Sequence, residues 1–205
     1  MKRSIRKNNP AFHFLLQFWQ KHCRLEKGHV DWAKQHIYIL DKVRKEETLY
    51  LDGDKQKNVY FVARGLLARV HDDTETGKRQ LWSIALPGMA LMTTKHLYSH
   101  TPSSGDIIVL RPGTLVIQIP YWAILEFKEQ EPQLNTLIGI LTNKKYKQMT
   151  ALSIILRETD LYTRYVAFAD DMPELHRVLT HGETAEITGI SLSSAQRYYK
   201  HWLNI

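Results

Sequence analysis

The first part of the chain has apolar residues at helical spacing. One stripe runs from Phe12 to Trp19 at positions i, i+3, i+4 and i+7, and a second runs from Trp32 to Leu40. Apolar residues at this spacing form one face of a helix. We therefore expect residues 11–40 to be helical and to bury this face against a core.

From about Asp41 to Pro120 the pattern changes to short apolar runs that alternate with turn residues. Gly, Pro and Asp separate the runs, as in Asp52-Gly53-Asp54 and Arg111-Pro112-Gly113. Many short strands at such intervals are typical of a sandwich or barrel. The predicted strands are Thr48–Leu51, Val59–Val62, Leu66–His71, Arg79–Ile84, Ile107–Leu110 and Thr114–Ile119.

Beyond Pro120 the pattern is helical again. Tyr121–Lys128 predicts a short helix, and Gln133 to about Thr159 predicts one of about 25 residues, or about 37 Å. An apolar stripe along this helix needs a partner, and we expect a second copy of the chain. The alternative is that the stripe packs on the chain's own barrel. Its residues are Leu134, Ile138, Leu141, Leu152 and Ile155.

The last 45 residues are predicted to be helical throughout. His181–Thr188 and Leu192–Trp202 form two short helices joined by a turn that contains Gly189. Two helices with such a turn are typical of a helix-turn-helix, and Ser191 suits the N-cap of the second helix. We expect Ala185, Ile190 and Ala195, together with Leu203, to pack the pair.

Composition narrows the classes of function. The net charge is +7, which favours a polyanionic partner, although residues 157–205 hold five Lys/Arg and seven Asp/Glu. The single cysteine excludes an intramolecular disulfide and a cysteine-ligated iron–sulfur cluster. We find neither a run of 18 apolar residues nor a signal peptide, so we expect a cytoplasmic protein without membrane contact.

Three segments together resemble the Crp/Fnr family of transcription regulators. The first is Thr48–Asp54 followed by Val59–Leu67, and the second is the hairpin-like His71–Trp82 followed by Leu86-Pro87-Gly88. The third runs from Arg164-Tyr165 through Pro173–Leu175 to Glu183–Arg197. These segments cover most of residues 43–200.

The resemblance implies an α+β fold with three parts. Residues 1–119 would form a β-jelly-roll sensor domain of the cyclic-nucleotide-binding type with N-terminal helices. Residues 120–160 would form the linker and dimerisation helix. Residues 161–205 would form a small winged-helix-type domain with the helix-turn-helix. Such a protein is a homodimer that binds double-stranded DNA and responds to an effector.

The second helix of a helix-turn-helix lies in the major groove, so its N-terminal residues are candidates for DNA contact. Arg197 suits guanine and Gln196 suits adenine, whereas hydroxyl groups suit phosphates. The family often has Arg and Glu where this chain has Leu192 and Ser193. The candidate residues are Thr184, Ser191, Leu192, Ser193, Ser194, Gln196, Arg197, Tyr199 and Lys200.

The effector pocket departs from the cyclic-nucleotide binders of the family. Those proteins have a Gly-Glu pair and an Arg-Ser pair, where the carboxylate binds the ribose and the cation binds the phosphate. Here Gly88 is followed by Met89, Ala90 and Leu91, and the second segment reads Ser103-Ser104-Gly105. We therefore expect no cAMP binding and no cofactor. An unidentified small-molecule effector remains open.

Two other classes of function are compatible with these residues. One is a ligand- or protein-binding sensor module whose helix-turn-helix no longer reads DNA. The other is a metal-dependent enzyme on a similar barrel, for which His71, His96 and His100 do not have the required spacing. We expect no metal site and no enzymatic activity, since catalytic signatures are also missing from the sequence.

Overall fold

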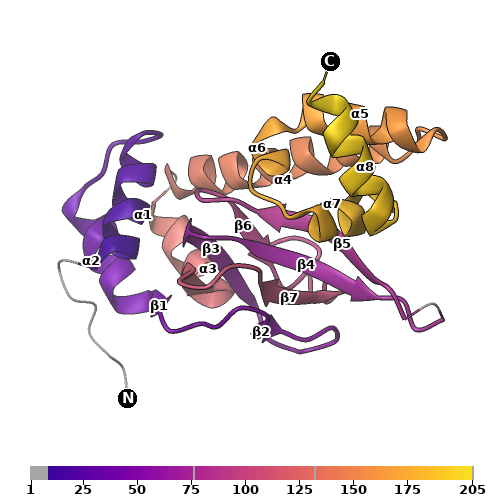
Figure 1. Ribbon diagram of the computed structural model, residues 1–205. Helices are drawn as coiled ribbons and strands as arrows, with labels where there is room; N and C mark the ends of the chain where they lie inside the picture. Colours follow the sequence, from indigo (N-terminus) through magenta and orange to yellow (C-terminus); the bar gives the residue numbers. More distant parts are fainter. Residues whose placement is uncertain (1–8, 76, 132, 205) are drawn as a thin grey trace. The chain divides into compact units, whose positions relative to one another are not determined.

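A computed structural model describes residues 9–75, 77–131 and 133–204. The described residues form two compact units (Figure 1). The first unit runs to Arg69 and includes Ile84–Lys145, and the second contains Val70–Ser83 and the chain from Tyr146 onward. The edges of these units fall at residues 69/70, 83/84 and 145/146, and the division at residues 119/120 and 160/161 stays a prediction.

The first unit begins with α1 (Pro10–Gln20) and α2 (Lys27–His36). The Asn9 side chain caps α1 by accepting hydrogen bonds from the N–H groups of Ala11 and Phe12, and Pro10 occupies the first turn, where an N–H is not needed. Residues 38–40 form the strand β1 (Tyr38–Leu40), which corrects the predicted helix. The aromatic and β-branched residues there suit a strand.

The described strands form two four-stranded antiparallel sheets. One has the order β1-β8-β3-β6 and the other β2-β7-β4-β5. All six predicted strands are present, while β1 and β6 are each three residues long and escaped the sequence pattern. The remaining strands are β2 (Thr48–Tyr50), β3 (Asn58–Arg64), β4 (Leu67–Asp72), β5 (Arg79–Ala85), β6 (Ala90–Met92), β7 (Asp106–Val109) and β8 (Leu115–Pro120).

Strand β3 is buried on both faces, which explains its unbroken apolar run. Tyr60 and Val62 pack in a cluster between the two sheets. Val59 and Phe61 point to the opposite face, where they meet residues of α1, α2, α3 (Tyr121–Gln130) and α4 (Gln133–Ile155). The first unit therefore has one core between its sheets and a second core beneath its helices (Figure 1).

The second unit is mainly helical. After α4 it contains α5 (Leu161–Asp171), α6 (Pro173–His176), α7 (His181–Thr188) and α8 (Leu192–Trp202). The ends of α7 and α8 are those that the sequence predicted. Among the described residues after Ile155 only helices occur, so the expected winged-helix type has no β-stranded wing there. No helix of the described chain has the length and apolarity that crossing a membrane requires.

Candidate nucleic-acid interface

Helices α7 and α8 are joined by a tight turn that their caps define. Gly189 adopts the left-handed conformation, with φ 68° and ψ 27°, and its N–H donates to the carbonyl of Ala185. Ser191 caps α8 by accepting a hydrogen bond of 3.0 Å from the N–H of Ser194. Thr180 and Glu183 cap the start of α7 reciprocally. Glycine is favoured at such a C-terminal turn because it lacks a Cβ.

A small core holds the two helices at a fixed geometry. Ala185, Ile190 and Ala195 are buried, as predicted, and they pack with Tyr165 and Ala169 of α5. Leu203 does not take part, since it is 57% exposed. Small residues at the crossing allow the helix backbones to approach closely, so the exposed face of α8 is well fixed.

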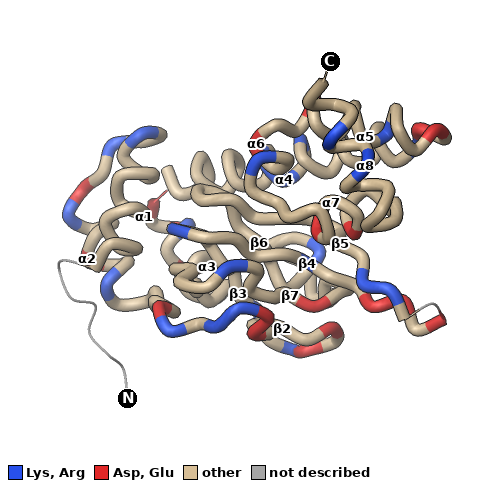
Figure 2. The backbone as a smooth tube through the Cα atoms, viewed as in Figure 1, with Lys and Arg blue, Asp and Glu red and all other residues tan. Residues whose placement is uncertain are grey.

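The exposed face of α8 presents most of the predicted base-reading residues. Tyr162, Tyr198, His201 and Asn204 complete a shallow hollow there with Ser193, Gln196, Arg197 and Lys200. The Arg197 guanidinium lies 5.1 Å from the ring centre of Tyr198. Leu192 is 51% exposed beside this hollow. Figure 2 shows Lys and Arg but no Asp or Glu along α8, so its surface is cationic.

The predicted phosphate contacts divide into two groups. Ser191 and Ser194 lie at the N-terminus of α8, where their hydroxyl oxygens are 2.8 Å apart. Tyr199 is half-buried and packs against His181, with ring centres 4.8 Å apart. Thr184 is only 3% exposed, and its carbonyl accepts a hydrogen bond from the Thr188 hydroxyl. Its burial withdraws Thr184 from the surface and corrects our prediction.

Several acids of residues 157–205 are engaged within the second unit. Glu186 pairs with Arg79 of the β4–β5 hairpin at 3.1 Å, and Asp170 accepts from the indole N–H of Trp202 at 3.2 Å. Asp160 caps α5, and Glu183 is buried in the cap of α7. These four acids all lie outside α8. The acidic balance of residues 157–205 therefore does not remove the positive charge of that helix.

The comparisons with known proteins identify this architecture. No family model and no curated protein matches the sequence, but many solved structures match the fold. A protein of the Crp/Fnr family from Eubacterium rectale has a TM-score of 0.66 at 12% identity, with 91% of this chain and 86% of that chain covered. The chain has the Crp/Fnr fold.

Two further structures agree with this result. The c-di-GMP responsive global regulator CLP of Xanthomonas campestris has a TM-score of 0.68 at 15% identity, covering 87% of this chain and 92% of that one. A transcriptional regulator of the CRP family from Thermus thermophilus has a TM-score of 0.61 at 15% identity, covering 82% and 84%. The family resemblance of the sequence is thus confirmed at the level of the fold.

The predicted effector-pocket residues of this Crp/Fnr fold do not surround one space. Met89 and Leu91 pack in the core between the sheets, whereas Ala90 belongs to the core beneath the helices. Ser103 is buried and donates from its hydroxyl to the carbonyl of Thr94 at 3.1 Å. Ser104 is exposed. Alternation along β6 accounts for the separation of Ala90 from its neighbours.

A buried cation near these serines escaped the sequence analysis. Arg69 of β4 is 5% exposed, and its guanidinium donates to the carbonyls of Ser104, Gly105 and Met92. Burial lowers the pKa of Arg69 from its ordinary value. This role has no signal in the sequence, because Arg69 lies 35 residues before Ser104 and no local motif connects them.

The predicted dimer residues of α4 are buried or partly buried within the chain itself. Leu134, Leu152 and Ile155 are at most 6% exposed, and Ile138 and Leu141 are partly buried. Packing of the apolar stripe within the chain itself is the alternative to dimerisation that the sequence left open. The exposed apolar residues of α4 lie elsewhere on the helix and include Tyr146, Met149 and Ile154.

Proposed function

We propose that this chain is a DNA-binding transcription regulator of the Crp/Fnr type and not an enzyme. The observation that carries the proposal is the exposed, acid-free face of α8, which the capped turn and the small core hold in a defined geometry. In a helix-turn-helix this face enters the major groove. The fold of the whole described chain supports the same function.

Arg197 and Gln196 would read the bases. A guanidinium pairs with two acceptors of guanine and an amide pairs with adenine, and each such pair discriminates by about 1–3 kcal/mol. Lys200, Ser191 and Ser194 would contact phosphates, which adds affinity without sequence preference. Leu192 and Ser193 would contribute apolar and hydroxyl contacts at the start of α8.

The proposed regulator acts as a homodimer on a roughly palindromic site, with its half-sites about one helical turn of DNA apart. The exposed side of α4 supports this, because its apolar residues are not covered by any other part of the described chain. We propose further that the sheets are a jelly roll of the cyclic-nucleotide-binding type. We also propose that the protein is cytoplasmic. We expect it to respond to an effector other than cAMP. Support comes from Arg69, whose Nη1 and Nη2 groups already donate to backbone carbonyls and are not free to bind a cyclic phosphate.

Fluorescence anisotropy on DNA from upstream of the chain's own gene tests the proposal, with random DNA of equal length as the control. We expect selective binding whose affinity falls steeply as salt rises. Arg197→Ala should reduce selective binding about 5- to 150-fold, which corresponds to about 1–3 kcal/mol. Arg177→Ala is the matched control, because Arg177 is an exposed arginine outside α7 and α8.

Two results would contradict the proposal. Equal affinity for the two DNAs at every salt concentration, with and without cell extract, would favour a sensor module that no longer reads DNA. Unchanged selectivity of Arg197→Ala would remove the assigned role of this residue.

A further inference from the structure

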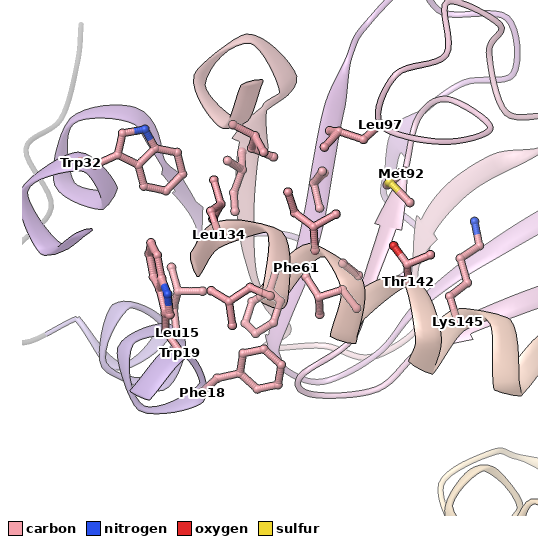
Figure 3. Close-up of a pocket in the computed structure, with 17 residues that line it drawn as sticks. Leu15, Phe18, Trp19, Trp32, Phe61, Met92, Leu97, Leu134, Thr142 and Lys145 are labelled. Carbon is pink, nitrogen blue, oxygen red and sulfur yellow. The ribbon is translucent and has the colours of Figure 1, made fainter. Parts of the chain in front are cut away.

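Two concave spaces of the molecule differ in what they can hold. The cavity beneath the helices of the first unit, whose lining Figure 3 shows, is almost wholly apolar and has a volume of about 70 Å³. This is roughly half the volume of an apolar cavity that accepts benzene, so the space is too small for a ligand. The hollow on α8 has about 660 Å³ and polar walls, and it can admit the edges of bases.

Tyr198 forms one wall of this hollow, and the second unit holds its ring in place. The side chain is half-buried, and its ring centre lies 5.3 Å from that of Tyr162 and 6.0 Å from that of Tyr165, both on α5. Tyr165 is fully buried, and its hydroxyl lies 2.8 Å from Nε2 of His176. Aromatic rings at such separations attract each other. The ring of Tyr198 is therefore a fixed surface.

The guanidinium of Arg197 rests on this ring. Its Cζ lies 5.1 Å from the ring centre of Tyr198, and its Nη2 donates to the Tyr198 hydroxyl at 3.4 Å. The first distance is within the range of a cation–π contact. Successive residues of a helix do not normally face each other, so the arginine leans along the surface of α8 to reach the ring. The contact restricts a side chain that is otherwise exposed.

The contact with Tyr198 leaves Arg197 able to bind a base. Only Nη2 donates to the tyrosine, so a pair of parallel N–H groups remains on the guanidinium. Among the residues that the structure describes, no carboxylate lies within ion-pair distance of Arg197, and α8 itself carries none. Two parallel donors match O6 and N7 of guanine.

We propose that Tyr198 is a positioning residue for base reading, which holds the guanidinium of Arg197 ready for guanine before DNA binds. The inference rests on the proposed function and deepens it. Ordering a flexible side chain at an interface lowers affinity unless the side chain is ordered in advance. A guanidinium held in one place therefore improves selectivity, whereas its charge attracts the phosphates of any sequence.

Nuclear magnetic resonance of the full chain without DNA tests the contact itself. The ring current of Tyr198 should move the Cδ proton signals of Arg197 upfield of their position in an unfolded peptide. The shift should disappear in Tyr198→Leu and persist in Tyr198→Phe, which keeps the ring. Unshifted signals in the unaltered chain would overturn the inference, whether or not the chain binds DNA.

Fluorescence anisotropy on the upstream DNA and on random DNA tests the positioning. Tyr198→Leu should lower the ratio of the two affinities about 2- to 12-fold and leave the affinity for random DNA unchanged. Tyr198→Phe should retain most of the ratio. In the Arg197→Ala background, Tyr198→Leu should lower the ratio no further, because Tyr198 acts through Arg197.

Tyr38→Leu is the control, since Tyr38 is an exposed tyrosine of β1 in the first unit. It should bind both DNAs as the unaltered chain does. Circular dichroism confirms that each variant is folded.

The outcomes separate this inference from the proposed function. If the unaltered chain binds the upstream DNA selectively, an unchanged ratio in Tyr198→Leu would overturn the inference, and so would additive losses from Tyr198→Leu and Arg197→Ala. A chain that shows the resonance shift but no selective binding would contradict the proposed function, and with it the positioning role.

Discussion

Lys145 of α4 is a half-buried cation, and no carboxylate of the described residues lies within ion-pair distance of its amine. Burial, together with the charge of Arg69, lowers the pKa of Lys145 to about 8, against 10.5 in the unfolded chain, so the unfolded state binds more protons between these two values. Its contribution to stability therefore rises as the pH increases through this window. At neutral pH the ammonium destabilises the fold.

Removal of this charge should accordingly stabilise the chain. At pH 7 we expect Lys145→Met to raise the free energy of unfolding by about 1–2 kcal/mol, less than the full shift because the ammonium is partly exposed. Urea unfolding measures this, with Lys147→Met as the control, since Lys147 is an exposed lysine. A less stable Lys145→Met would show that the amine has a partner in solution.

His176 provides a second prediction at the scale of one residue. Its Nε2 lies 2.8 Å from the hydroxyl of Tyr165, and burial followed by the charge of His181 lowers the pKa of His176. Because the folded-state pKa lies below 6.5, the unfolded state binds more protons as the pH falls through 6.5. The stability from His176 is present above this pH and is lost below it.

Unfolding midpoints at pH 7.5 and pH 5.5 test the role of His176. The unaltered chain should lose more stability between these two values than His176→Gln, which does not titrate there. If the two proteins lost the same stability between pH 7.5 and pH 5.5, His176 would not be the source of the pH dependence.

At the scale of elements, the turns of the fold differ in their tolerance of a side chain. Both Gly65, between β3 and β4, and Gly189, between α7 and α8, have positive φ. A Cβ at Gly65 would lie 2.2 Å from the Thr114 hydroxyl oxygen and 2.8 Å from its Cα. A Cβ at Gly189 would meet its nearest atom, on Arg164, at an ordinary 3.6 Å.

Gly189→Ala should therefore cost only the left-handed backbone, about 1–2 kcal/mol. Gly65→Ala should cost about 1–3 kcal/mol more, because Thr114 and its backbone must move. Denaturant unfolding of both variants checks this order. Equal losses of unfolding free energy in the two variants would mean that Thr114, at the start of β8, can move at little cost.

The elements differ in how well the sequence predicts them. The bounds of α7 and α8 were correct, because N-cap residues, a glycine and apolar spacing agree there. Strand β1 was missed because its residues continue the apolar stripe of the predicted helix, and β6, of three residues, was not recognised in the sequence pattern. The role of Arg69 could not be predicted, since its hydrogen bonds reach residues 23 to 36 positions away in the sequence.

At the scale of the whole molecule, the proposed dimer should depend on the exposed side of α4. Ile154 is 58% exposed, and a charge there would be buried in a dimer that uses this side. We expect Ile154→Glu to sediment as a monomer at concentrations where the unaltered chain is a dimer. DNA affinity should fall in parallel, because two reading helices bind together.

Leu51→Glu is the control for this experiment, since Leu51 is similarly exposed, at 55%, and lies after β2. A dimeric Ile154→Glu would place the interface elsewhere. A monomeric unaltered chain that still binds DNA selectively would contradict the dimer altogether.

The bonds of Arg69 also bear on the order of events in folding. Its guanidinium holds Met92 at one end of a segment and Ser104 and Gly105 at the other, so one side chain closes the excursion between β6 and β7. The contacts span 23 to 36 residues, and such distant contacts form slowly. Residues 93–103 should therefore become protected from hydrogen exchange only after β4 has docked, among the last parts of the first unit to do so.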